Sequence, residues 1–143
     1  MSGLSTVLSV RTRERDARRL ALAKLMREDA ALEAETRRLG ADAQGQLAEV
    51  AGLGRGGRFD VRAAADRRYH ALQLRRDAAA VGQRRIELAG RIADARRELT
   101  EADAARRAVE KLIERRDAEA AAEADRRAQL RLEDEHAARA AAG

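Results

Sequence analysis

Apolar residues in the first third of the chain recur with the seven-residue period of a coiled-coil helix. One row consists of Leu25, Leu32 and Leu39, and the companion row, three or four residues away, consists of Leu22, Asp29, Thr36, Ala43 and Val50. Asp29 and Thr36 interrupt the apolar pattern of the second row. Because two such rows form a stripe that packs on a partner helix, the pattern predicts a helix over about residues 4–51.

The second half of the chain carries a longer pattern of the same kind. Its core-facing positions alternate in steps of four and three along Leu88, Ile92, Ala95, Leu99, Ala102, Arg106, Val109, Ile113, Arg116 and Ala120. A row upstream has a different phase and consists of Leu72, Ala79 and Ile86. The change of phase predicts a stutter or a slight bend near Gly82 and Gly90. We expect a second helix over about residues 60–141.

A glycine-rich stretch, GLGRGGR at residues 52–58, separates the two patterns and holds four of the ten glycines. Glycine tolerates positive φ and loses much backbone entropy in a helix. The stretch therefore predicts a turn between the helices. Asp60 is a good N-cap for the second helix, and Phe59 is placed to pack onto its first turn near Ala64.

The same stretch has the spacing of a phosphate-binding loop, from Gly52 to Gly57. Such a loop requires Lys and then Ser or Thr after the second glycine, and it follows a β-strand. Here Arg58 and Phe59 occupy those positions, and the preceding segment has a helical pattern. The inter-helix turn is the preferred interpretation, and no nucleotide or other cofactor is expected.

These elements predict an all-α protein, an antiparallel two-helix coiled-coil hairpin with a longer second helix, in which residues 1–143 form a single hairpin. The composition agrees, because proline is absent, charged residues make up 38% and aromatic residues 1%, which leaves no material for a wide core. The two helices would be about 70 Å and about 120 Å long. We expect Leu4 to lie opposite Ala105, with the C-terminal third left without a partner helix.

The sequence offers no constellation for catalysis or metal binding. It has no cysteine, and its two histidines, His70 and His136, are far apart. Most carboxylates lie three or four residues from an arginine, which is typical of ion pairs on an exposed helix rather than of a catalytic cleft. We expect no enzyme activity, metal or small-molecule substrate. No run of about 18 apolar residues predicts a membrane span, and the expected location is cytoplasmic.

Charge is distributed unevenly along a chain whose formal net charge is +5. Residues 51–97 carry twelve arginines and five acids, and residues 98–143 carry nine basic and twelve acidic residues. The arginine doublets of the middle segment are Arg67-Arg68, Arg75-Arg76 and Arg84-Arg85. They are spread around the helix and have only Tyr69 as a nearby ring, so the pattern does not favour a nucleic-acid surface.

Tyr69 and Leu72 lie three residues apart in this basic segment. They form either the tip of the hairpin core or an exposed anchor for a protein partner.

The segment from Ala95 to Arg139 resembles the FliJ proteins of the bacterial flagellar export apparatus. The shared features are an alanine- and arginine-rich run, then Glu110-Lys111-Leu112, and then Arg127, Gln129, Leu132, Glu133 and Asp134. Two substitutions depart from the family pattern, since Ala128 stands for the usual Glu and Leu130 stands where Lys is common. The order of Glu133 and Asp134 is also reversed.

The resemblance implies a coiled coil similar to the stalk subunit of rotary ATPases, peripheral to the inner-membrane export apparatus. It implies three partners: the flagellar export ATPase ring, the cytoplasmic domain of the export gate, and export chaperones. By this analogy Tyr69 and Leu72 are candidate gate contacts, and Val109, Leu112 and Ile113 are candidate ATPase contacts. The sequence does not distinguish a flagellar protein from a component of virulence-type secretion. Two alternatives stay open, namely a coiled-coil scaffold that self-associates through its C-terminal part and an arginine-rich nucleic-acid binder.

Overall fold

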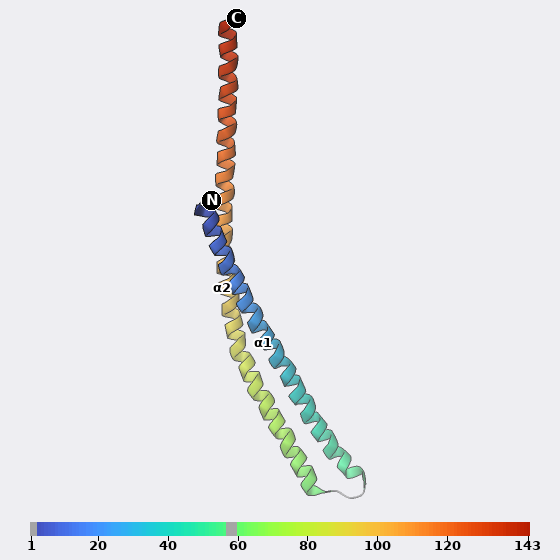
Figure 1. Ribbon diagram of the computed structural model, residues 1–143. Helices are drawn as coiled ribbons and strands as arrows, with labels where there is room; N and C mark the ends of the chain where they lie inside the picture. The colour runs from blue at the N-terminus through green and yellow to red at the C-terminus, as the bar shows by residue number, and fades with distance from the viewer. Residues whose placement is uncertain (1–2, 57–59) are drawn as a thin grey trace. The chain divides into compact units, whose positions relative to one another are not determined.

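The computed structural model describes residues 3–56 and 60–143, and almost all of them are helical. Helix α1 is Gly3–Leu53, a short 3-10 helix η1 is Gly54–Gly56, and α2 is Val61–Ala142. The described residues contain no strand. The predicted fold class, an antiparallel two-helix coiled-coil hairpin with a longer second helix, is confirmed (Figure 1). The grouping of residues 1–143 into a single hairpin stays a prediction.

The start of α2 is fixed by a side-chain cap. Asp60 Oδ1 accepts hydrogen bonds from the backbone N–H groups of Arg62 at 3.0 Å and Ala63 at 3.2 Å. The backbone N–H of Ala64 donates to the Asp60 carbonyl oxygen at 3.1 Å. The two bonds to Asp60 Oδ1 satisfy amides that have no partner within the helix, and they confirm the predicted N-cap. The predicted contact of Phe59 lies outside the described residues, as do the last two residues of the predicted turn, 57 and 58.

The chain divides into two compact units, and each unit takes segments from both helices. The hairpin unit is residues 18–99, and the terminal unit is residues 1–17 with 100–143. In the hairpin unit α1 and α2 run side by side in opposite directions (Figure 1). Its buried residues are Leu39, Ala43, Val50, Ala64, Ala71, Leu88 and Ala95. Four of these seven residues are alanines, and the seven line the contact between only two helices. The core is therefore a narrow row rather than a globular interior.

Within the hairpin unit, the core positions of α2 follow one uninterrupted phase. Buried or half-buried residues recur in alternating steps of three and four at Ala64, Arg67, Ala71, Leu74, Ala78, Val81, Arg85, Leu88, Ile92, Ala95 and Leu99. The predicted second row of Leu72, Ala79 and Ile86 was wrong, because all three residues are exposed. No stutter is therefore required between Ala64 and Leu99.

Two arginines explain the error in phase. Arg67 and Arg85 occupy core positions, so the charged residues concealed the true row. Their long aliphatic stems pack along the core while the guanidinium groups reach acids on α1. Leu72 and Ile86 lie on the outer face of α2, where their apolar character imitated a core row.

The terminal unit has a looser core. Leu4, Leu8, Thr12 and Arg15 of α1 are half-buried, and so are residues of α2 as far as Ile113. Arg15 Nη1 lies 3.8 Å from Asp103 Oδ1, and an antiparallel register counted from this pair puts Leu4 opposite about residue 114. The expected pairing of Leu4 with Ala105 was therefore wrong. Helical structure continues to Gly56, past the centre of the glycine-rich stretch, so residues of α1 lie opposite later residues of α2 than the sequence predicted.

Candidate partner-binding surfaces

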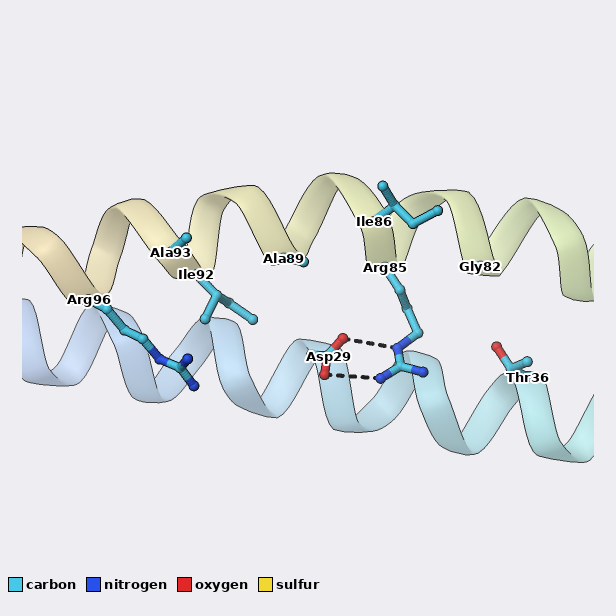
Figure 2. A pocket seen from close by; sticks show the side chains of 9 residues that line it. All are labelled: Asp29, Thr36, Gly82, Arg85, Ile86, Ala89, Ile92, Ala93 and Arg96. Atoms are coloured by element: carbon cyan, nitrogen blue, oxygen red, sulfur yellow. Dashed lines mark hydrogen bonds and ion pairs between the residues drawn. The ribbon is translucent and has the colours of Figure 1, made fainter.

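Ion pairs at the two-helix contact give the hairpin unit its most defined polar geometry. Arg85 Nε donates to Asp29 Oδ1 at 3.0 Å, and Arg85 Nη2 donates to Asp29 Oδ2 at 3.2 Å. Figure 2 shows the two parallel contacts between the helices. Arg85 Nη2 also lies 3.9 Å from Glu33 Oε2. A bidentate pair of this kind is among the strongest and most directional hydrogen-bonded contacts.

The pair changes the protonation behaviour of both groups. The hydrogen bonds from Arg85 lower the pKa of Asp29, although partial burial acts in the opposite direction. The same bonds raise the pKa of Arg85. Each side chain is about one third exposed, so both stay ionised at neutral pH. Asp29 is one of the two residues that interrupt the apolar pattern of the first helix. Its partner, Arg85, belongs to the arginine doublet Arg84-Arg85.

A shallow hollow of about 510 Å³ lies beside this ion pair. Its lining consists of Asp29, Thr36, Gly82, Arg85, Ile86, Ala89, Ile92, Ala93 and Arg96. Ile92 points toward α1, whereas Ile86 points away from it (Figure 2). The hollow exists because Gly82 and Ala89 leave space on α2. Its only carboxylate is held by Arg85, so its lining presents no pair of acid and base groups for catalysis.

Further ion pairs across the contact involve residues along both helices. Arg67 pairs with Glu49 and donates to Gln46 Oε1 at 3.2 Å. Arg18 pairs with Glu98 at 3.1 Å. These pairs agree on one register within the hairpin unit. They show that part of the arginine excess serves the contact between α1 and α2.

The predicted gate contacts, Tyr69 and Leu72, are both exposed on α2. Their exposed fractions are 64% and 46%. Of the two roles left open by the sequence, the tip of the core is occupied instead by Ala64 and Ala71. Tyr69 and Leu72 are three residues apart, which places them on neighbouring positions of one helix face. They form an exposed apolar pair, and Ile86 is a further exposed apolar residue of α2 that the sequence assigned to the core.

The predicted ATPase contacts, Val109, Leu112 and Ile113, do not form one free surface. Val109 and Ile113 are half-buried at core positions of the terminal unit. Leu112 lies at the edge and is 38% exposed. Only Leu112 therefore presents a large part of its side chain to a partner without repacking.

Every residue from Glu114 to Gly143 is exposed. This stretch includes Leu130 and Leu132, two large apolar residues. It also contains an ion-pair cluster in which Glu123 lies 3.0 Å from Arg126 and 3.3 Å from Arg127. No contact with α1 covers the apolar residues, so the stretch is available to other molecules.

The described residues form neither a metal site nor a membrane span. Among residues 3–56 and 60–143, no group of three or more His, Asp or Glu side chains is arranged to hold a metal ion. No helix within the described part of the chain combines the length and apolar character of a membrane span.

The chain is similar in sequence to a known protein family. No curated protein and no solved structure matches the chain. The family model described as "Flagellar FliJ protein" matches residues 1–143, the whole chain. The chain therefore belongs to the FliJ family of flagellar export proteins.

Proposed function

We propose that this protein couples the flagellar export ATPase to the export gate and assists the delivery of chaperone-bound substrates. It would act by contact, without an enzyme activity of its own, on the cytoplasmic side of the inner-membrane export apparatus. Membership of the FliJ family supports a part in flagellar export. The charged helices with separate apolar patches support a role in binding other proteins.

The observation that carries the gate contact is the exposure of Tyr69 and Leu72. Both side chains are surrounded by polar neighbours on α2, including the exposed Arg68 and Arg76. Tyrosine beside arginine is enriched at protein interfaces, because its ring provides a large contact area and its hydroxyl a hydrogen bond. We assign the gate-binding surface to this pair.

Leu112 is the corresponding candidate for the ATPase contact. It lies beside the exposed Lys111 and near the half-buried Val109 and Ile113, which hold this part of α2 in place. An apolar centre with a charged rim is the usual composition of a protein interface. The two proposed surfaces lie in different units of the chain.

The gate assignment is tested with the double variant Tyr69→Ala/Leu72→Ala. We expect its affinity for the cytoplasmic domain of the gate to fall about tenfold or more, because both anchors are removed. Its helical circular dichroism and its affinity for the ATPase should stay unchanged. Leu20→Ala removes an equally exposed apolar side chain from α1 and serves as the matched control. Wild-type gate affinity in the double variant would exclude this surface.

A further inference from the structure

The core positions of α2 continue beyond the last half-buried residue, Ile113. The alternation of three and four residues that runs through Ala102, Arg106 and Val109 also fits the exposed stretch that follows. Continued in the same phase, the core positions are Arg116, Ala120, Glu123, Arg127, Leu130 and Asp134. We call residues 116–134 the extension stripe. Its members are all exposed in this structure.

We propose that the extension stripe pairs with the same stripe of a second copy of this chain, in antiparallel orientation. Steps of three and four read the same in both directions, so antiparallel copies centred on Asp125 bring core positions opposite each other. Arg116 then meets Asp134 of the second copy. Ala120 meets Leu130, and Glu123 meets Arg127. Twofold symmetry repeats each contact, as in an isologous dimer.

Charge selects this register over its alternatives. In a parallel, in-register pair, Arg116, Glu123, Arg127 and Asp134 would each face the identical residue of the other copy. An antiparallel shift of one heptad in one direction would oppose Arg116 to Arg127, and a shift in the other direction would oppose Glu123 to Asp134. Like charges at core positions are strongly unfavourable, so they exclude these arrangements. Among these four arrangements, only the proposed one opposes unlike charges at every charged core position.

The pairing is expected to be weak and sensitive to salt. The stripe is about 28 Å long, and its only apolar layers are those of Ala120 with Leu130. On the flanks Asp117 would face Arg131 favourably, but Glu119 would face Glu133. The ion pairs that Glu123 makes within its own chain are exposed, so exchanging them for contacts with the second copy changes the free energy little.

Sedimentation velocity of the full chain over a range of concentrations at low salt tests the proposal. We expect a monomer–dimer equilibrium that shifts toward monomer as salt rises. Asp134→Arg places an arginine opposite Arg116 and should weaken the dimer by at least about tenfold. Arg116→Asp should do the same. The double variant Arg116→Asp/Asp134→Arg exchanges the charges and should restore the dimer.

Mixing the two single variants provides an independent readout. Neither should dimerise alone, but together they place unlike charges at both ends and should form a mixed dimer. Asp125→Arg makes the same Asp-to-Arg change on the face of α2 opposite the extension stripe and is the control. Circular dichroism checks that each variant stays helical.

Disulfide crosslinking tests the orientation of the two copies. Because the chain has no cysteine, Ala120→Cys and Leu130→Cys chains should crosslink with each other more readily than either with itself.

A wild-type chain that stays monomeric, or a charge exchange that fails to restore the dimer, would refute the self-pairing. Preferential crosslinking of each cysteine variant with itself would indicate a parallel dimer and would also refute it. The inference does not rest on the proposed coupling role. Loss of gate binding in the Tyr69 and Leu72 variant would leave it unaffected, since that pair lies in the hairpin unit.

Discussion

Asp29 of α1 and Arg85 of α2 occupy facing core positions of the hairpin unit and share two hydrogen bonds, at 3.0 and 3.2 Å. Apolar residues would pack at these positions in an ordinary coiled coil. A charged pair in this place fixes the register, because sliding one helix by a heptad would place Asp29 opposite Ala78 or Ile92 and leave Arg85 without a carboxylate partner at the facing core position. The pair therefore contributes more to alignment of the two helices than to their adhesion.

The pair predicts a specific acid sensitivity. The hydrogen bonds from Arg85 lower the pKa of Asp29 below its ordinary value of 3.8. A depressed carboxyl pKa contributes stability that is fully present above the unfolded-state pKa and is lost as pH falls through the lower folded-state pKa. We expect the Tm of wild type to exceed that of Asp29→Asn at pH 7, and the difference to shrink below about pH 3.8. Thermal circular dichroism of both chains across pH measures it.

A constant difference in Tm between the two chains at all pH values would contradict the proposed contribution of Asp29. Asp42→Asn is the matched control, because Asp42 pairs with Arg38 at 3.2 Å within α1 alone. Its removal leaves the contact between the helices intact. We expect its Tm to follow that of wild type closely at every pH.

The corrected phase of α2 predicts opposite outcomes for two neighbouring residues. Leu88 is 5% exposed and Ile86 is 66% exposed. Leu88→Ala removes a buried side chain and should lower the free energy of unfolding by about 2–4 kcal/mol. Ile86→Ala should change it by less than about 0.5 kcal/mol. Urea denaturation measures both, and a larger loss for Ile86→Ala would restore the phase inferred from the sequence.

The N-cap of α2 predicts a smaller effect. Asp60 accepts hydrogen bonds from two backbone N–H groups of the first turn. Asp60→Ala leaves these groups to water and should destabilise the protein by about 1 kcal/mol, whereas Asp60→Ser should retain most of the stability. Asp66→Ala, at an exposed position six residues further along, is the control. Equal losses for Ala and Ser at residue 60 would show that the cap does not determine the start of α2.

The fold could be predicted from the sequence more completely than the contacts between the two helices. Helix-forming residues without proline and a single cluster of glycines were sufficient to predict two long helices. The end of the first helix was placed too early, because α1 extends to Leu53 and is followed by η1. The sequence did not reveal the phase of the core positions of α2, because two of these positions hold the charged residues Arg67 and Arg85. Their partners on α1 become visible only when the register is known. For the same reason, Tyr69 and Leu72 could not be assigned to the core or the surface from their spacing alone.

The exposure of Leu112 predicts how the proposed ATPase contact can be separated from folding. Leu112→Ala removes a partly exposed side chain at the edge of the core, so helicity should persist while about tenfold more protein is needed for half-maximal stimulation of ATP hydrolysis by the export ATPase. Val109→Ala is less informative, since that residue is half-buried and its loss disturbs packing. Leu132→Ala, which removes a leucine of the same helix that is 66% exposed, is the matched control. If Leu132→Ala impairs stimulation and Leu112→Ala does not, the ATPase contact lies beyond residue 113 and competes with the proposed pairing of two copies.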